Sequence, residues 1–205
     1  MYLVKSPFFL KKYYSNFVWK IPTAEKIIYL TFDDGPTPEI TEWTLATLKT
    51  FNAKATFFCV GSNVAKHPEI FQKIICDEHA IGNHTHHHLN GWHTDKEAYF
   101  RNIKKCEEVV KSNLFRPPYG RIKKSQYELI KEDYKVIMWD VLSGDFDPKT
   151  TPEKCLKNVT NNTTEGSVVV FHDSLKAADN LKYTLPKVLE YFTEKGYRFE
   201  KLELY

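Results

Sequence analysis

The sequence predicts an α/β fold, a distorted (β/α) barrel with about seven parallel strands. The first reason is that short apolar segments alternate with helix-like segments about seven times from Lys26 onward. The second is that neither G-x-G-x-x-G nor a Walker sequence occurs, which counts against an open doubly wound sheet that binds a nucleotide. The third is the length, because 205 residues suit one domain with its own core.

Composition excludes several classes of protein. Hydrophobic residues make up 42% of the chain and aromatic residues 15%, which indicates a globular rather than a disordered protein. The 29 basic and 26 acidic residues nearly balance and are scattered, so we expect no nucleic-acid-binding surface. The four cysteines form no C-x-x-C pair, which argues against a zinc ribbon or redox motif, and we expect them to be reduced and buried.

The first twenty residues do not have the pattern of a secretory signal peptide. Lys5, Lys11 and Lys12 interrupt the apolar residues, and no small-residue cleavage site follows. No apolar run reaches the ~20 residues that a membrane-spanning helix needs. The default expectation is therefore a cytoplasmic protein without a membrane span.

The clearest strand signal is the segment 27–32, an uncharged run of β-branched and aromatic residues that stops at Asp33-Asp34-Gly35-Pro36. The segment 55–60 (ATFFCV) is similar and is bounded by Gly61. A further strand is expected within 114–120, ending at Arg116. The remaining strands are expected at residues 80–82, 135–141, 167–171 and 198–204.

Helices are expected between these strands, where apolar residues recur at helical spacing. In the segment 38–51, the candidate inner positions are Ile40, Trp43, Leu45 and Leu48. The other helices are expected at residues 68–79, 95–112, 125–133, 152–162 and 183–195. This alternation of strand and helix favours parallel strands.

Residues 1–25 differ from the rest, because they carry aromatic side chains without a clear period. The aromatic residues of this segment are Tyr2, Phe8, Phe9, Tyr13, Tyr14, Phe17 and Trp19. We expect an N-terminal extension that packs across the outside of the domain as a lid or plug, with an aromatic substrate-binding face as the alternative. Residues 26–205 would then form the domain that carries the chemistry.

Reactive side chains recur at the carboxyl ends of the predicted strands. They are Asp33 and Asp34, His84 and His88, Arg116, Asp140 and Asp145, and His172 with Asp173. In a parallel barrel these ends face one mouth, where catalytic groups gather. The chain is therefore expected to build one active site from distant segments, although the DDGP stretch alone could equally be a surface turn.

The histidine-rich stretch NHTHHH contains side chains that can bind a metal ion. The spacing of His84 and His88 puts both imidazoles on one side of a helical turn or of a strand, so either backbone lets them share a metal. Spacing does not choose between these two and their neighbours His86, His87 and His93, and a histidine-rich loop without a site is the alternative. Two histidines and a nearby aspartate suit zinc or another divalent cation that activates water.

Four motifs in this order, TFDDGP, HTHHH, RPPYG and VFHD, make the chain resemble the polysaccharide deacetylases, the NodB-homology enzymes of carbohydrate esterase family 4. The resemblance covers approximately residues 26–205. It implies a hydrolase of non-peptide carbon–nitrogen bonds that removes N-acetyl groups from N-acetylglucosamine-type residues of a poly- or oligosaccharide. It also implies one divalent metal ion, Zn²⁺ in the first place, with Co²⁺ or another divalent ion as alternatives.

The resemblance implies roles for the first three motifs. Asp33 would be the general base, and Arg116 would orient it. Asp34 would bind the metal together with His84 and His88, which selects these two histidines from the cluster.

The later motifs complete the implied site and also depart from the family pattern. The backbone N–H of Tyr119 would help to hold the oxyanion, and His172 would be the general acid, tuned by Asp145. Val170 stands where the family has leucine. Phe146 stands where the family has a tryptophan that walls the sugar groove, so substrate choice is affected more than chemistry.

Three other functions remain open at this point. A hydrolase of a small amide or cyclic imide would keep the fold and the metal. An iron oxygenase is disfavoured by the α/β alternation, and a non-catalytic carbohydrate-binding relic is disfavoured because binding alone needs neither Asp33 nor His172. The expected partner is a carbohydrate substrate, bound by a monomer; peptidoglycan, a chitin-like chain and a capsule are all open, and Trp139 is expected in the core.

Overall fold

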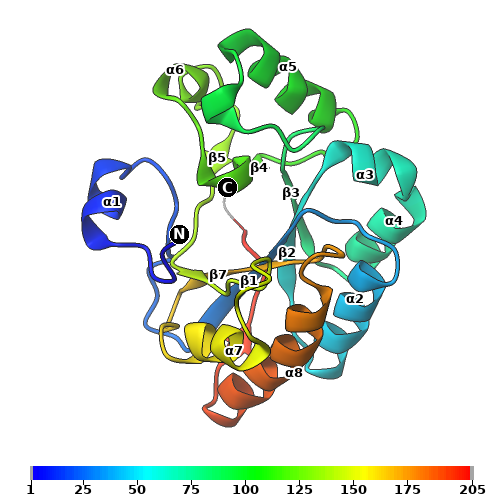
Figure 1. Ribbon diagram of the computed structural model, residues 1–205, viewed down its shortest axis with the longest axis vertical. Helices are drawn as coiled ribbons and strands as arrows, with labels where there is room; N and C mark the ends of the chain where they lie inside the picture. The colour runs from blue at the N-terminus through cyan, green and yellow to red at the C-terminus, as the bar shows by residue number, and fades with distance from the viewer. Residues whose placement is uncertain (1, 204–205) are drawn as a thin grey trace.

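The computed structural model describes residues 2–203, which form a curled β-sheet surrounded by helices (Figure 1). The strands are β1 (Ile27–Asp33), β2 (Ala55–Cys59), β3 (Ala80–Asn83), β4 (Leu114–Phe115), β5 (Lys135–Val136), β6 (Val141–Leu142), β7 (Val168–His172) and β8 (Arg198–Phe199). Their order is β5-β4-β3-β2-β1-β7-β6, β8 pairs with β1, and all these pairings are parallel. The predicted α/β fold, a distorted barrel with about seven parallel strands, is confirmed.

The helices connect the strands, except the first one, Phe8–Tyr13, which precedes β1 and has no buried residue. They are α1 (Phe8–Tyr13), α2 (Ile40–Thr50), α3 (Gly61–Lys66), α4 (Pro68–Cys76), α5 (Lys96–Glu107), α6 (Lys124–Tyr127), α7 (Pro152–Thr160) and α8 (Ala178–Glu194), with 3-10 turns η1 (Gly91–His93) and η2 (Pro118–Gly120). In α2 the expected inner residues Ile40, Leu45 and Leu48 are buried, whereas Trp43 is only partly buried and packs against the same core. No helix within residues 2–203 is both long and apolar enough to cross a membrane.

Strand β1 lies at the centre of the sheet, between β2 and β7. The ring of Phe32 stacks on Phe57 of β2 and Phe171 of β7, with centroid distances of 5.0 and 6.0 Å. Burial of each such ring contributes ~1.5–3 kcal/mol, so the three central strands are held together in one register. The carboxyl end of β1 is therefore well supported on both sides.

The predicted strand 135–141 is wrong as a single element, because the structure divides it into β5 and β6. Between them, the backbone of Met138 donates to the carbonyl of Val18 at 2.7 Å, and Val18 donates to Val136 at 2.9 Å. The N-terminal segment therefore takes the hydrogen bonds that would continue this strand. The apolar run at 135–141 does not reveal that its hydrogen-bond partner is Val18 of the N-terminal segment.

Other predicted elements differ in length. Only the first turn of the predicted helix 125–133 forms, as α6. The strand predicted at 198–204 ends at Phe199, and its residue 204 lies outside the described chain. The last helix begins at Ala178, five residues before the predicted start at Tyr183. Helices α1 and α3 were not expected, and both are only 6 residues long. Short helices give a weak periodic signal.

Asp140 does not lie at the mouth of the barrel, where its position after a predicted strand had placed it. It is buried, with 1% exposure, and its carboxylate contacts the ammonium groups of Lys5, at 2.6 Å, and of Lys11. Ser167 also donates to it at 2.6 Å. Asp140 therefore anchors the N-terminal segment to the sheet.

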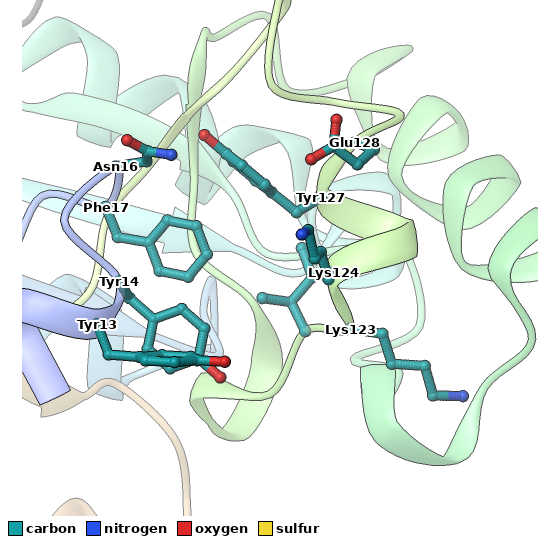
Figure 2. A pocket seen from close by; sticks show the side chains of 9 residues that line it. Tyr13, Tyr14, Asn16, Phe17, Lys123, Lys124, Tyr127 and Glu128 are labelled. Carbon is teal, nitrogen blue, oxygen red and sulfur yellow. The ribbon is translucent and has the colours of Figure 1, made fainter.

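The same segment places Tyr14 and Phe17 beside the region of α6 (Figure 2). The Phe17 ring lies between Tyr14, stacked at 5.3 Å, and Tyr127, edge-on at 5.0 Å, beside a surface pocket of about 300 Å³. The Trp19 indole donates to the carbonyl of Tyr14 at 3.0 Å. These contacts hold residues 14–19 against the outside of the sheet.

The expectation of buried cysteines is correct for three residues and wrong for one. Cys59, Cys106 and Cys155 are buried, whereas Cys76 is exposed at the end of α4, and all four are free thiols. The buried face of α4 consists of Ile70, Phe71 and Ile74, so Cys76 points elsewhere on the helix. Cys76 is therefore exposed because it lies outside the buried face of α4.

Candidate active site

The turn after β1 separates the two adjacent carboxylates. Asp33 is the last residue of β1 and is buried, with 4% exposure. Asp34 leaves the strand with a φ of 83°, a left-handed conformation that few non-glycine residues adopt. The change of direction lets two neighbouring carboxylates take different positions in one cavity.

Asp173, which directly follows the neighbouring strand β7, holds this turn in place. Its Oδ1 accepts the Gly35 N–H at 3.0 Å, and its Oδ2 accepts the Thr41 hydroxyl at 2.5 Å. Burial raises the pKa of Asp173 to about 8, against the opposing effect of the Thr41 hydrogen bond. The sequence placed Asp173 among the reactive residues at the strand ends, and its contacts show that it supports the β1 turn.

Gly35 is required by this close approach. A Cβ atom at position 35 would lie 2.0 Å from Oδ2 of Asp173, far inside van der Waals contact. No side chain fits there without displacement of a fully buried carboxyl group. The glycine of the DDGP stretch therefore serves packing in addition to the turn.

Asp34, His84 and His88 lie together, with one ligand atom of each within 4.8 Å of the others. Oδ1 of Asp34 lies 3.2 Å from Nε2 of His88 and 3.8 Å from Nε2 of His84. This oxygen is buried and receives no well-aligned hydrogen bond. Burial would raise the pKa of Asp34, but the contact with His88 and the charge of His172 hold it well below its usual value.

His84 has the tautomer and charge of a metal ligand. Its Nδ1 lies 2.8 Å from the carbonyl oxygen of Arg116, so Nδ1 carries the proton and Nε2 keeps its lone pair toward Asp34. Burial lowers the pKa of His84 to about 4, against the opposing charge of Asp33, so the imidazole is neutral. A buried oxygen without a partner beside a neutral imidazole fits a divalent cation.

The neighbouring histidines have other surroundings. Nδ1 of His87 lies 2.8 Å from the side-chain amide of Asn102 and points away from Asp34. His86 is packed against Gly61. His93 belongs to η1. Among the residues that the structure describes, only Asp34, His84 and His88 form such a group.

Arg116 is fully buried and holds Asp33. Its Nη1 donates to Oδ1 of Asp33 and to the hydroxyl of Thr31, both at 2.7 Å. Nε and Nη2 donate to the carbonyls of Ile137 and Met138 at 3.1 and 3.0 Å. This network fixes the guanidinium and presents one charge-assisted hydrogen bond to the carboxylate.

His172 and Asp145 form a second fixed pair. Nδ1 of His172 lies 2.8 Å from Oδ1 of Asp145, and the His172 backbone N–H donates to Oδ2 at 2.7 Å. Burial would lower the pKa of His172, but the charge and hydrogen bond of Asp145 raise it to about 9, with help from Asp34 and Asp33. The imidazole is therefore protonated at neutral pH, with Nε2 free to donate.

These groups open into one cavity of about 490 Å³. It is lined by Tyr2, Asp33, Asp34, His84, His88, Tyr119, Arg121, Trp139, Leu142, Phe146, Val170, His172, Ser174 and Lys176. With the exception of Asp140, the predicted site residues lie on this cavity or directly behind it, where Arg116 and Asp145 are buried. Convergence of the strand ends explains this placement.

The aromatic walls include residues that sequence reasoning missed or misplaced. Phe146 lies edge-on to His172 with 5.0 Å between centroids, and Tyr119 packs on His88 at 4.7 Å. Trp139 was expected in the core but is only partly buried and lines the cavity, where its ring contacts Gly120. Tyr2 was named only among the aromatic residues of the N-terminal segment, for which a substrate-binding face was the alternative to a lid or plug, because no motif surrounds it.

Comparison with known proteins identifies relatives along most of the chain. A family model described as polysaccharide deacetylase matches residues 20–136. A peptidoglycan-N-acetylglucosamine deacetylase of Bacillus cereus is 35% identical over 191 residues, which are 88% of this chain and 88% of that protein. The peptidoglycan-N-acetylmuramic acid deacetylase PdaC of Bacillus subtilis is 29% identical over 184 residues, 85% of this chain and 37% of PdaC.

A solved structure matches the fold over almost its whole length. It is the crystal structure of a peptidoglycan N-acetylglucosamine deacetylase in complex with 4-naphthalen-1-yl-N-oxidanyl-benzamide. The match has a TM-score of 0.88 and 32% sequence identity, and covers 96% of this chain and 95% of that one.

Proposed function

Because the chain belongs to the polysaccharide deacetylase family, we propose that it removes N-acetyl groups from N-acetylglucosamine-type residues of a poly- or oligosaccharide in a metal-dependent hydrolysis. The chain is an enzyme, a polysaccharide deacetylase, and it acts on carbon–nitrogen bonds other than peptide bonds. Beyond the family and the enzyme class, the proposal concerns the metal ion, the roles of individual residues and the kind of sugar unit that is deacetylated. It also assigns these roles to a catalytic domain at 26–205, with residues 1–25 as an extension.

One observation carries the proposal. A buried carboxylate held by Arg116 and an imidazole held by Asp145 lie at the same cavity, next to the group of Asp34, His84 and His88. Hydrolysis of an acetamide needs a group that takes a proton from water and another that gives a proton to the departing amine. Asp33, which faces the positive charge of Arg116, would take the first proton. His172, which faces the negative charge of Asp145, would give the second.

Asp34, His84 and His88 would hold the metal, which we propose to be Zn²⁺, since imidazole and carboxylate ligands suit this ion. A divalent cation bound there would make a water molecule more acidic and polarise the acetyl carbonyl group. The hydrogen bond from His84 to the Arg116 carbonyl keeps the ligating nitrogen oriented.

Asp33 would act as the general base. It accepts a hydrogen bond from Arg116 at 2.7 Å, which fixes the direction of the carboxylate. Asp33 would take a proton from the attacking water while the water oxygen bonds to the carbonyl carbon. The carbonyl oxygen then gains negative charge, and the backbone N–H of Tyr119 would donate a hydrogen bond to it.

His172 would act as the general acid. Its pKa of about 9 keeps the ring protonated at neutral pH, and Asp145 occupies Nδ1. The proton on Nε2 would therefore pass to the amine nitrogen as the carbon–nitrogen bond breaks. The products would be acetate and a sugar with a free amino group.

The carbohydrate substrate is supported by the names of the relatives and by the shape of the cavity. Two of the relatives are named as a peptidoglycan-N-acetylglucosamine deacetylase and a peptidoglycan-N-acetylmuramic acid deacetylase. The cavity here has a partly apolar wall of Trp139, Leu142 and Phe146, which suits the apolar face of a sugar ring. We propose an N-acetylglucosamine-type unit as the substrate. We also propose that the protein is a monomer, and light scattering in solution tests its oligomeric state.

Acetate release tests the proposal. The metal-stripped protein is incubated with N-acetylglucosamine oligomers or peptidoglycan, with zinc, cobalt or no metal added, beside Asp33→Asn. Metal-dependent release that the variant abolishes supports the proposal. Release from small amides alone, or no release while a metal binds tightly, would overturn it in favour of a small-amide hydrolase or a carbohydrate-binding relic.

A further inference from the structure

Tyr2 reaches the active-site cavity from the N-terminal segment, outside all four motifs. Its ring lies 5.1 Å from the ring of Phe146 between centroids, tilted by 53°. Phe146 in turn lies 5.0 Å from His172. Tyr2 and Phe146 thus form an aromatic wall that extends outward from the proposed acid.

The position of Tyr2 is fixed by contacts on the neighbouring loop. Its hydroxyl shares a hydrogen bond of 2.6 Å with the hydroxyl of Thr150, which is buried. Three residues further on, Lys5 forms an antiparallel bridge with Val141 and an ion pair of 2.6 Å with the buried Asp140. The segment that carries Tyr2 is therefore attached to β6 by its backbone as well as by its side chains.

The loop after β6 is shaped to receive this ring. Gly144 has a φ of +80°, which glycine adopts without steric cost. A Cβ atom there would lie 2.4 Å from the Tyr2 hydroxyl oxygen. The absence of a side chain at position 144 is thus what allows Tyr2 to lie beside Phe146.

The rings of Phe146 and Tyr2 lie at different distances from the proposed acid, because Phe146 contacts His172 and Tyr2 contacts Phe146. Phe146 adjoins His172, and so would lie next to the amine that leaves when the acetamide is hydrolysed. Tyr2 packs on Phe146 and lines the same cavity, so a neighbouring unit of a glycan chain that lies along this wall would meet the Tyr2 ring. Phe146 also has a smaller ring than the tryptophan that the family pattern places there, so Tyr2 supplies aromatic surface beside it.

We propose that Tyr2 determines substrate length, because it binds the sugar unit next to the one whose acetamide is hydrolysed. This inference rests on the proposed deacetylase function. The apolar face of that second unit packs on the Tyr2 ring, while the hydroxyl remains bonded to Thr150 and keeps the ring in place. The N-terminal segment is then part of the substrate-binding surface.

The test compares N-acetylglucosamine itself, which has no neighbouring unit, with its tetrasaccharide. Tyr2→Ala is expected to lower kcat/KM for the tetrasaccharide roughly tenfold and to change kcat/KM for the monosaccharide by less than about threefold. Tyr2→Phe keeps the ring and is expected to retain most of the activity on both. Phe8→Ala is the matched control, because Phe8 lies in the same segment with 79% exposure, and it should match the wild type.

Binding in the Asp33→Asn background separates this inference from the proposed reaction. Calorimetry should show the same loss of affinity for the tetrasaccharide when Tyr2→Ala is added, with the melting temperature recorded for each variant. Equal losses for both sugars, or no loss for the tetrasaccharide, would overturn the role of Tyr2. Absence of acetate release from wild type with intact tetrasaccharide binding would count against the deacetylase function alone.

Discussion

Asp33 and His172 are register partners on the adjacent parallel strands β1 and β7. Partners in such a pair have side chains on the same side of the sheet, ~5 Å apart at their origins. The proposed base and the proposed acid are therefore neighbours in the sheet, although they lie far apart in the sequence. Each then receives a different partner, Arg116 or Asp145.

Removal of the charge of Asp145 should change the pH dependence of the reaction. His172 must be protonated to act as an acid, so kcat/KM should fall as pH rises through its pKa of about 9. In Asp145→Asn the charge that raises this pKa is lost, and the alkaline limb should move down by about one pH unit or more, with a rate loss of about 10²-fold. Asp147→Asn, on the same loop, should leave the limb unchanged. An unmoved limb in Asp145→Asn would assign it to another group.

Replacement of Arg116 should cost both stability and activity. Arg116→Met leaves Asp33 and two backbone carbonyls without their buried donor. Loss of one member of a buried ion pair costs ~3–5 kcal/mol. A decrease in melting temperature of about 10 °C is expected for a chain of this size, together with loss of acetate release. A variant that melts like the wild type would show that the ion pair contributes little to the fold.

The metal should depend on His84 and His88 but not on His87. His84→Ala and His88→Ala each remove one donor from the group with Asp34, and should weaken metal binding by at least roughly 100-fold. His87→Ala serves as the control, since its ring contacts Asn102. Metal content after dialysis and acetate release are the readouts. Retention of the metal in both His84→Ala and His88→Ala would place the site elsewhere.

A side chain at position 35 should disturb the β1 turn. In Gly35→Ala the new Cβ atom meets Oδ2 of Asp173 at 2.0 Å, so the turn or the carboxyl group must move. Overpacking of this kind costs ~1–3 kcal/mol. Because Asp34 directly precedes Gly35, metal affinity should fall as well. Calorimetric melting and metal titration of the variant, compared with wild type, decide whether the turn tolerates the methyl group.

The sequence was most informative where local pattern and chemistry coincide. The apolar run at 27–32 predicted β1 to within one residue, because a central strand buried on both faces needs β-branched and aromatic residues along its whole length. Polar residues at successive strand ends predicted one shared mouth, since parallel strands place all their carboxyl ends together. The order of the four motifs pointed to the family, which the comparisons confirm.

The tertiary structure decided what depends on contacts between distant segments. The strand expected at 135–141 divides because Val18 takes the hydrogen bonds at Met138, and Asp140 turns to Lys5 instead of the cavity. No local pattern encodes such partners, which are separated by more than 100 residues. Tyr2 became part of the cavity for the same reason: its place is set by Thr150 and by the space that Gly144 leaves, and both contacts exist only after the chain has folded.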